Sequence, residues 1–573
     1  MSFRLAGMSL AAALMASTSS AAAPAYDLVI RGGDIYDGSG GAPVNGDVAI
    51  KGQRIACVGA CPGSAKKTVD ARGKAVSPGF INMLSWSTES LIADGRGLSE
   101  LKQGVTLEVM GEGDSMGPLS PEMKRLALQR QGDIKYPIGW TTLDEYLRFL
   151  EKKGVSVNVA SFIGAATARI HVVGEGDVDP TPDQLARMRA LVTKAMEDGA
   201  MGVGSSLIYA PGSYAETDEL VALVTEAGRC GGMYISHMRS EGNRLEQAVD
   251  ELITISRRSG APAEIYHLKA SGKPNWGKLD GVLKQIETAR AEGLRITADM
   301  YTYPAGSTGL DAAMPTWVQA GGVEAWIARL KDPETRAKVK AEMIGEPVGF
   351  ENLQRHAGAE GTLLVGFKNP KLKPLTGKTL AQVAQERGVS PQDAAIDLVI
   401  EDGSRVQVVY FLMDEANVAR QTALPWLSFG SDAEGQAPEG PFLLSSTHPR
   451  AYGNFSRLLA KYVRDEKRLT LSEAVRKLSA LPAHNLGLHD RGMLKVGNYA
   501  DVVVFDPATI QDHATFEKPQ QFSTGVSEVV VNGQLSLAGG EPTAARPGQV
   551  VRGRGWTGWK DGGCRTAAKD WSW

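Results

Sequence analysis

The middle of the chain alternates short apolar runs with longer amphipathic segments, and this alternation limits the possible fold more than any other feature. The segments at 182–198, 244–259 and 277–292 read as helices, and the last two have apolar residues three and four apart. Such alternation predicts parallel strands joined by crossover helices, and eight strand–helix units predict an α/β (β/α)8 TIM barrel. We expect the eight strands to end at Met83, Gly111, Ile163, Ser205, His237, His267, Met300 and Ser431.

Both ends of the chain have a different pattern from the middle. Residues 24–76 and 485–573 contain short alternating runs separated by Gly-containing turns, which are typical of antiparallel strands. We therefore expect one small β-sandwich formed by both terminal regions, with the barrel over 77–484. The connection before the last barrel strand, at about 305–425, is too long for a simple loop and predicts an insertion whose first part forms a lid beside the pocket.

Residues 1–23 have the order of features that is typical of a secretory signal peptide. Arg4 precedes an apolar run at 10–15, and small residues follow up to a cleavage position near Ala23. The alternative is a cytosolic protein with an unstructured, Ala-rich start. Because no later apolar run reaches transmembrane length, we expect a periplasmic or secreted protein with no membrane insertion after signal removal.

Composition limits the partners of the protein. The chain has 62 basic and 65 acidic residues and a net charge of -3, so it offers no strongly basic surface for nucleic acid. A small-molecule ligand of modest polarity is expected instead. The four cysteines are too few for a disulfide scaffold, and the spacing of Cys57 and Cys61 is compatible either with a disulfide or with two free thiols.

Two histidines at the ends of neighbouring predicted strands indicate a metal site. His237 and His267 each finish an apolar run, and Asp432 follows the last barrel strand. A single strand-end His is more often packed or hydrogen-bonded, but a pair at adjacent barrel strands favours ligation. Because a catalytic zinc site needs three protein ligands and an open position, the third ligand has to come from another segment.

Several longer motifs occur in a fixed order along the chain. They are VSPGFI at 76–81, GAMG at 199–202, YAPG at 209–212, HMR at 237–239, YHLK at 266–269, ADMY at 298–301, AGST at 305–308, GSD at 430–432, HPRAYG at 448–453, DRG at 490–492 and GNYAD at 497–501. Together they resemble the amidohydrolase superfamily and, within it, the D-aminoacylase or N-acyl-D-amino-acid deacylase family. The resemblance extends over nearly the whole chain after the N-terminal segment.

The resemblance implies a barrel with a β-sandwich and one tightly bound zinc ion. In the family, a strand-end Cys and two His hold the zinc, and a strand-eight Asp is the acid and base; His237, His267 and Asp432 match these positions. The Cys is absent, and aligning the two sides of the gap places either Glu112 or Gly113 there. We favour Glu112 because a carboxylate oxygen binds zinc, the alternative being that Glu112 lies outside the ligand shell.

The chain departs from the family at two further places. Leu84 and Trp86 stand where the superfamily has His-x-His at the end of the first strand, so an alkyl group and an indole are expected to line that wall. A binuclear centre is then improbable, which leaves either a one-metal enzyme, the reading we prefer, or a scaffold without activity. The stretch 164–166 also lacks a family His, which indicates a changed substrate shape or polarity.

The resemblance also implies a substrate class. Tyr301 and Ser307 match the family's carboxylate-binding pair, although Tyr301 could simply pack against the lid. Arg239 follows a metal histidine and Trp86 lines the opposite wall, so both are candidate substrate-binding residues, as is Lys269.

The expected reaction is hydrolysis of an N-acyl amino acid, in particular an N-acyl-D-amino acid. Zinc would activate a water molecule while Asp432 serves first as base and then as acid. The alternatives are hydrolysis of another peptide-like, cyclic or N-carbamoyl amide, or an inactive exported binding protein on the same scaffold.

Overall fold

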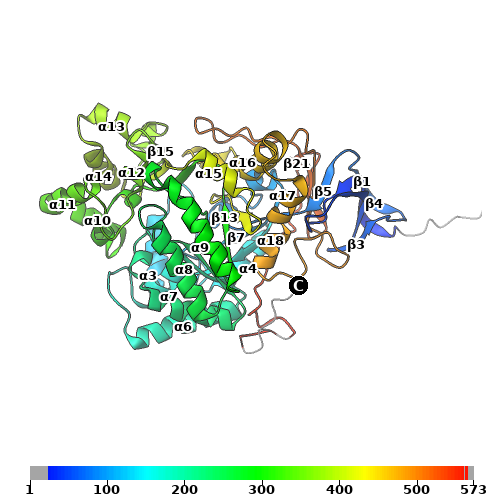
Figure 1. The fold of residues 1–573 in the computed structure, drawn as a ribbon, viewed down its shortest axis with the longest axis horizontal. Helices are drawn as coiled ribbons and strands as arrows, with labels where there is room; N and C mark the ends of the chain where they lie inside the picture. The colour runs from blue at the N-terminus through cyan, green and yellow to red at the C-terminus, as the bar shows by residue number, and fades with distance from the viewer. Residues whose placement is uncertain (1–23, 561, 565–573) are drawn as a thin grey trace, which may run out of the picture.

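The computed structural model describes residues 24–560 and 562–564, and three parts follow one another along its longest axis (Figure 1). The inserted helices α10 to α14 lie at one end, the barrel lies in the middle, and the sheet that contains β1, β3 and β4 lies at the other end. The predicted signal peptide, 1–23, falls outside the described residues. None of the helices in the described part of the chain is both long enough and apolar enough to cross a membrane.

The middle of the chain forms the strands and crossover helices of a TIM barrel. Its parallel strands are β6 (Phe80–Asn82), β7 (Val105–Met110), β8 (Asn158–Ser161), β9 (Ile163–Gly164), β10 (Gly202–Ser206), β11 (Met233–His237), β12 (Ala263–Ile265), β13 (Ile296–Met300) and β17 (Leu427–Phe429). The order β6-β7-β8 continues, after one intervening residue, as β9-β10-β11-β12-β13-β17. The backbone N–H of Met83 donates to Phe429 across 3.3 Å, so the last strand meets the first.

The predicted fold class and the predicted strand ends are confirmed. Taken together, β8 and β9 form the third barrel strand, and the eight strands end within two residues of the expected positions. The helices expected between the strands are α6 (Pro182–Glu197), α8 (Leu245–Ser259) and α9 (Leu279–Ala291). Helix α8 turns Leu245, Val249 and Leu252 towards the sheet, which is the helical spacing read from the sequence.

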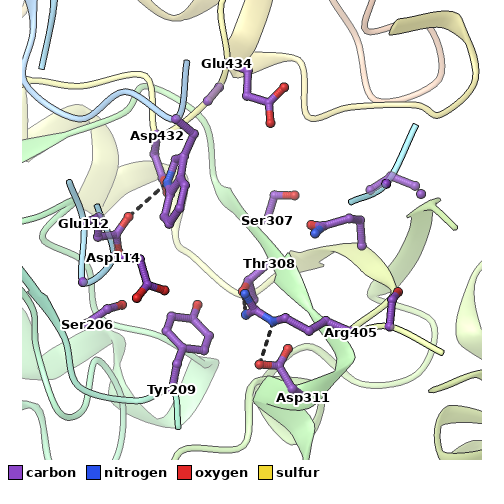
Figure 2. A pocket seen from close by; sticks show the side chains of 18 of the residues that line it. Glu112, Asp114, Ser206, Tyr209, Ser307, Thr308, Asp311, Arg405, Asp432 and Glu434 are labelled. Carbon is purple, nitrogen blue, oxygen red and sulfur yellow. Dashed lines mark hydrogen bonds and ion pairs between the residues drawn. The ribbon is translucent and has the colours of Figure 1, made fainter. Parts of the chain in front are cut away.

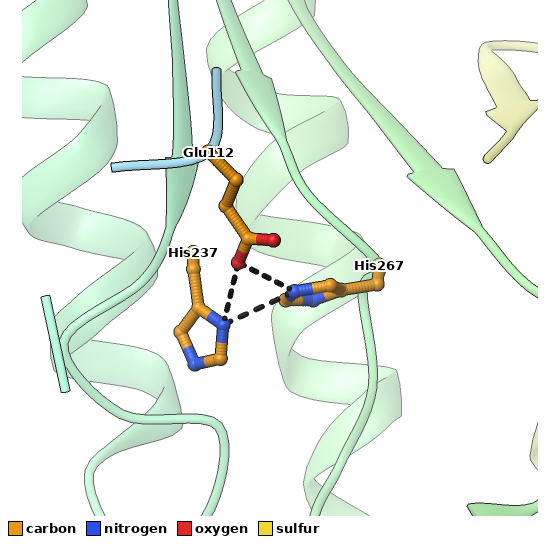
Figure 3. Close-up of side chains that lie close together, drawn as sticks. All are labelled: Glu112, His237 and His267. Atoms are coloured by element: carbon orange, nitrogen blue, oxygen red, sulfur yellow. Dashed lines mark hydrogen bonds and ion pairs between the residues drawn. The ribbon is translucent and has the colours of Figure 1, made fainter. Parts of the chain in front are cut away.

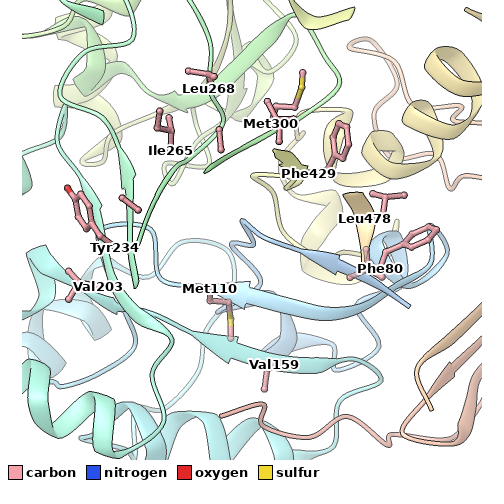
Figure 4. Packing of buried hydrophobic residues seen from close by; sticks show 14 of the residues in the cluster. Phe80, Met110, Val159, Val203, Tyr234, Ile265, Leu268, Met300, Phe429 and Leu478 are labelled. Atoms are coloured by element: carbon pink, nitrogen blue, oxygen red, sulfur yellow. The ribbon is translucent and has the colours of Figure 1, made fainter. Parts of the chain in front are cut away.

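Apolar side chains fill the barrel interior and the layer between strands and helices. Figure 4 shows Met110, Tyr234, Ile265, Met300 and Phe429 in this layer, and each is at most 1 % exposed. Because such cores are close-packed, the strand ends above them are held in fixed positions. The polar residues that follow these strands are therefore attached to a rigid part of the protein.

Both termini contribute to one nine-stranded sheet, as predicted. Its N-terminal strands are β1 (Tyr26–Ile35), β2 (Val44–Lys51), β3 (Arg54–Gly59), β4 (Ala65–Asp70) and β5 (Ala75–Pro78), and its C-terminal strands are β18 (Val502–Phe505), β19 (Val526–Val531), β20 (Gln534–Ala538) and β21 (Glu541–Pro542). Strands β5 and β18 pair antiparallel and join the two terminal regions. After β21 the chain returns to the barrel, where Gly553 N–H donates to Gly199 across 2.8 Å.

All four cysteines are paired. Cys57 and Cys61 form the short disulfide that the sequence left open. Cys230 and Cys564 form a second disulfide, 334 residues apart in sequence, which spacing alone gave no reason to expect. This second pair ties the returning C-terminal segment to the end of helix α7 (Thr217–Arg229).

The insertion before the last barrel strand has a core of its own. It contains the antiparallel sheet β14 (Ala305–Gly309), β16 (Gln407–Phe411) and β15 (Thr362–Gly366), with helices α10 (Gly322–Leu330), α11 (Pro333–Ile344), α12 (Leu353–Ala357), α13 (Leu380–Arg387), α14 (Pro391–Asp402) and α15 (Glu415–Gln421). Trp326, Leu364 and Val399 belong to its buried cluster. This subdomain stands beside the barrel mouth and supplies one side of the pocket described below.

Candidate metal centre

Three buried side chains converge at the carboxyl ends of the barrel strands (Figure 3). His237 Nδ1 lies 3.1 Å from Glu112 Oε1 and 3.1 Å from His267 Nε2, and His267 Nε2 lies 3.2 Å from Glu112 Oε1. Glu112 follows β7, His237 ends β11 and His267 follows β12. Two imidazole nitrogens and one carboxylate oxygen around a single point form a ligand set suited to catalytic zinc.

The structure resolves the choice between Glu112 and Gly113. Glu112 is 5 % exposed and turns its carboxylate to both histidines. Gly113 has φ +73°, and a Cβ built there would lie 2.6 Å from the Cβ of Ser206. Gly113 therefore allows the tight turn that positions Glu112. A side chain at position 113 would collide with Ser206, so only glycine fits there.

Two of the candidate site residues lie in a strained backbone conformation. His267 has φ +35° and Asp432 has φ +51°, values that non-Gly residues rarely adopt. Both are held there by hydrogen bonds, because His267 N–H donates to Asp299 Oδ1 across 2.8 Å and Asp432 N–H donates to Leu84 O across 2.9 Å. Such strain is typical of functional sites, where surrounding structure fixes a side chain in a required direction.

A buried carboxylate and a buried lysine lie behind His267. Glu241 Oε1 is 2.9 Å from His267 Nδ1, and Lys269 Nζ donates to the same oxygen across 2.5 Å. When the Nδ1–H of His267 donates to Glu241, the lone pair of its Nε2 points towards Glu112 and the candidate metal centre. This arrangement of carboxylate and histidine is the one that orients imidazole ligands in metal sites, so the residues present fit a bound cation.

The electrostatics of the cluster favour added positive charge. Burial would raise the pKa of Glu112, but its hydrogen bonds with His237 and His267 hold that pKa well below its usual range. Burial and Lys269 lower the pKa of His267, yet Glu241 and Glu112 outweigh them and bring it to about 10. A proton on His267 interacts favourably with the same carboxylates that would attract a metal ion.

Asp432 faces this cluster from the end of the last barrel strand. Its Oδ1 accepts a hydrogen bond from Trp86 Nε1 across 3.0 Å, and its Oδ2 lies 2.8 Å from Arg450 Nη1. Burial raises the pKa of Asp432, and Arg450 opposes only part of that rise. A carboxylate with a raised pKa is suited to accept a proton and then to return it.

These groups open into a cavity of about 730 Å3 between the barrel mouth and the insertion. Figure 2 shows Glu112 and Asp432 on one side of the cavity and Ser307 and Arg405 on the other. Tyr301, Ser307 and Trp86 line the cavity, as the sequence predicted. The hydroxyl of Ser307 donates to Val408 O across 2.9 Å.

One wall of the cavity carries two cations around an aromatic ring. Lys269 Nζ lies 5.5 Å from the centre of the Tyr301 ring, and the guanidinium carbon of Arg450 lies 4.4 Å from it. Tyr301 is 1 % exposed, so the ring fixes the relative positions of the two cations. Lys269 is already paired with Glu241, whereas Arg450 Nε has no hydrogen-bond partner among the described residues, so Arg450 is the cation of this wall that can bind an anionic group such as a carboxylate.

Two expectations about the pocket are wrong. Arg239 does not line the cavity, because its guanidinium pairs with Glu251 across 2.9 Å and donates to Ser213 O across 2.9 Å. Leu84 is fully buried in an apolar cluster, so only the indole of Trp86 faces the cavity from the first strand. Both errors have one cause: the side-chain direction after a strand end depends on the loop and cannot be read from strand alternation.

Three further functional candidates emerge only from the structure. Glu241 stands four residues after His237, a spacing that could have indicated a supporting carboxylate. Arg450 lies within the HPRAYG motif, from which no role for the Arg was drawn. Arg405 lines the cavity and pairs with Asp311 across 2.8 Å, and no sequence pattern marked it.

Comparisons with known proteins identify the family of the chain. Residues 67–536 match the model described as the amidohydrolase family. The chain is 34% identical to the N-acyl-D-glutamate deacylase of Alcaligenes xylosoxydans xylosoxydans over 532 residues, which are 92% of this chain and 96% of the relative. It is 32% identical to the D-aminoacylase of the same organism, covering 89% of this chain and 94% of the relative.

Solved structures give the same result. The N-acyl-D-glutamate deacylase of Bordetella bronchiseptica, complexed with zinc and a phosphonate inhibitor, has a TM-score of 0.76 and 30% identity over 92% of this chain and 99% of that chain. A D-aminoacylase structure with a TM-score of 0.76 is 30% identical over 92% of this chain and 100% of that chain. That protein is described as having a binuclear metal center with one-metal activation and second-metal attenuation.

Proposed function

Because this chain belongs to the amidohydrolase family, we propose that it is a zinc-dependent deacylase that hydrolyses the amide bond of N-acyl-D-amino acids. The observation that carries the proposal is the convergence of Glu112, His237 and His267 opposite Asp432, at the carboxyl ends of barrel strands. The relatives at 32% to 34% identity support the substrate class, because they are an N-acyl-D-glutamate deacylase, an N-acyl-D-aspartate deacylase and a D-aminoacylase.

Glu112, His237 and His267 would hold the zinc ion. When bound there, zinc supplies Lewis-acid chemistry, which makes a water molecule more acidic and polarises the amide carbonyl. Glu241 fixes His267 by accepting from its Nδ1–H, and Lys269 balances the charge of Glu241. The centre is at most 5 % exposed, so bulk water does not screen its charges.

Asp432 moves the proton in both halves of the reaction. Its carboxylate accepts a proton from the attacking water and then donates that proton to the nitrogen of the leaving amine. Arg450 and Trp86 contact its two oxygens and hold the carboxylate towards the centre. The products are a carboxylic acid and a free amino acid.

The wall formed by Arg450 and Tyr301 would bind the α-carboxylate of the substrate, because Arg450 Nε has no hydrogen-bond partner in the part of the chain that the structure describes. It lies beside the centre, because the Tyr301 ring is 6.2 Å from the His267 ring, measured between their centres. An anchored carboxylate fixes the orientation of the amide, and such positioning contributes strongly to catalysis. The remaining cavity, which includes Arg405, would take the side chain and the acyl group.

The test is a panel of N-acetyl-D- and N-acetyl-L-amino acids, with release of free amine measured for the zinc-loaded and chelator-treated protein. We expect hydrolysis of D-substrates, loss of activity with chelator, and recovery with added zinc. Hydrolysis confined to cyclic or N-carbamoyl amides, or binding of N-acyl-D-amino acids without hydrolysis, would contradict the proposal.

We also propose that the protein is exported to the periplasm or secreted. The signal-like start of the sequence supports this, as do the two disulfides, because disulfides persist in oxidising compartments. Expression of the full chain followed by cell fractionation tests the proposal. Export should leave a mature chain that begins near residue 24, whereas an uncleaved cytoplasmic chain would refute it.

A further inference from the structure

The indole N–H of Trp86 lies between the two carboxylates of the site. It is 3.1 Å from Glu112 Oε2 and 3.0 Å from Asp432 Oδ1. Glu112 belongs to the ligand cluster and Asp432 is the proposed acid and base, so one neutral donor touches both functional groups. Figure 2 shows these two carboxylates on the same side of the cavity.

The surroundings of Trp86 leave no ligand set for a second ion. Leu84 and Trp86 follow the first barrel strand, β6, and neither side chain offers a ligand atom. Leu84 is fully buried, and a Cβ built on Gly430 would lie 2.8 Å from its Cβ, so this position is tightly packed. Within the described residues, Glu112, His237 and His267 are the one group of three that could hold a metal.

We propose that the Trp86 N–H takes the place of a second cation, holding Asp432 and Glu112 in position, so that the enzyme uses a single zinc ion and is not attenuated by excess zinc. This inference rests on the proposed function. It differs from what is described for the related D-aminoacylase, which has a binuclear center with second-metal attenuation. Trp86 is in this view a positioning residue that acts through the two carboxylates.

The physical need for such a donor follows from the charges. Two carboxylates that approach one site repel each other unless a positive group lies between or beside them. On Asp432, Arg450 contacts Oδ2 and leaves Oδ1 to Trp86. On Glu112, the histidines contact Oε1 and leave Oε2 to Trp86. Hydrogen bonds to ionised oxygens are roughly twice as strong as neutral ones, so a single N–H can orient both groups.

The first test counts zinc ions by metal analysis after equilibrium dialysis against increasing zinc. We expect the wild-type chain to saturate at one zinc in the low micromolar range, with activity unchanged by further zinc. The variant Trp86→His places an imidazole where the indole faces the cavity, beside Asp432 and Glu112, and we expect it to bind a second zinc and to lose activity as that ion binds. A second zinc in the wild-type chain, with falling activity, would overturn the inference.

The second test removes the N–H alone. Trp86→Phe keeps an aromatic ring, and we expect kcat to fall roughly 10- to 100-fold while KM changes by less than about threefold and the first zinc is retained. Trp317→Phe is the matched control, because Trp317 Nε1 also donates to a carboxylate, Glu342 Oε2, across 2.9 Å but lies in the insertion and does not line the cavity. It should leave kcat unchanged. A wild-type kcat in Trp86→Phe would refute the positioning role.

The two tests fail in distinguishable ways. If the wild-type chain hydrolyses no N-acyl-D-amino acid, the proposed function fails, but the zinc counts of the wild-type chain and of Trp86→His still decide whether the indole excludes a second ion. Trp86 is 36 % exposed, so its replacement should not prevent folding, and thermal unfolding curves of both Phe variants check this. A Trp86→Phe chain that unfolds at the wild-type temperature yet loses kcat supports the inference.

Discussion

Two walls of the barrel mouth differ in the groups that balance buried charge. The ligand wall, made by Glu112, His237 and His267, brings three candidate ligand atoms within 3.2 Å of one another, where a bound cation would balance their charge. The first-strand wall, made by Trp86, offers no ligand atom and donates one N–H to the two neighbouring carboxylates.

The two walls differ in the neighbours that support them. The ligand wall is independent because its parts are fixed from behind: His267 by Glu241 and Asp299, and Glu112 by the turn at Gly113. The first-strand wall is anchored by Leu84, which lies two residues before Trp86 and packs in a buried apolar cluster. Each wall is therefore supported by its own neighbours, and mutations should separate them.

The largest effect is expected from breaking the ligand wall. His267→Ala removes one of three ligand atoms, so zinc content should fall from one per chain to near zero and kcat by a factor on the order of 1,000 or more. Metal analysis and turnover measure both. His513→Ala, which removes a His in the loop between β18 and β19, is the control and should keep full zinc. A His267→Ala chain with wild-type zinc content would exclude His267 as a ligand.

A large effect without metal loss is expected at the junction of the two walls. Asp432→Asn keeps the size of the side chain but removes the proton acceptor, so kcat should fall about 100- to 10,000-fold. Zinc content should stay at the wild-type value, because Asp432 lies outside the ligand group. Substantial residual turnover would show that another group moves the proton.

The pH dependence follows from the same carboxylate. Burial raises the pKa of Asp432, with partial opposition from Arg450, and the reaction needs the ionised form. Activity is therefore full above that pKa and is lost as pH falls through it, so the acid limb of kcat/KM should lie above the usual range for an Asp. The residual activity of Asp432→Asn should lack this limb, and a limb that persists would assign it to another group.

A smaller effect is expected behind the ligand wall. Glu241→Gln weakens the hydrogen bond that orients His267, and supporting residues of this kind typically change metal affinity about 10- to 100-fold. Competition with a chelator of known affinity measures the change. Equal zinc affinity in the variant and the wild-type chain would mean that packing alone orients the imidazole.

The smallest catalytic effect is expected just beyond the ligand wall. Arg239 pairs with Glu251 away from the cavity, so Arg239→Lys should leave KM within about twofold of wild type. It should lower the free energy of unfolding by about 1 kcal/mol, because a bidentate pair is lost. A marked rise in KM would restore Arg239 as a substrate-binding residue.

The sequence by itself determined the architecture and identified the two histidines of the candidate metal centre. Strand and helix periodicities are local, so the eight strand ends and the helices between them could be read directly. Because parallel strands of a barrel end at one face, residues that follow these strands were expected to meet there, and His237, His267 and Asp432 do meet. The joining of both chain ends in one sheet followed from their shared pattern.

Only the tertiary structure decided how side chains beyond the strand ends are directed. Loop backbone angles, such as φ +73° at Gly113 and +51° at Asp432, depend on contacts with distant segments and leave no local pattern. For this reason the sequence could not choose between Glu112 and Gly113, and it placed Arg239 in the cavity. The sequence placed Trp86 in the pocket wall but did not predict its hydrogen bonds, because the two carboxylates that its N–H contacts are 26 and 346 residues away.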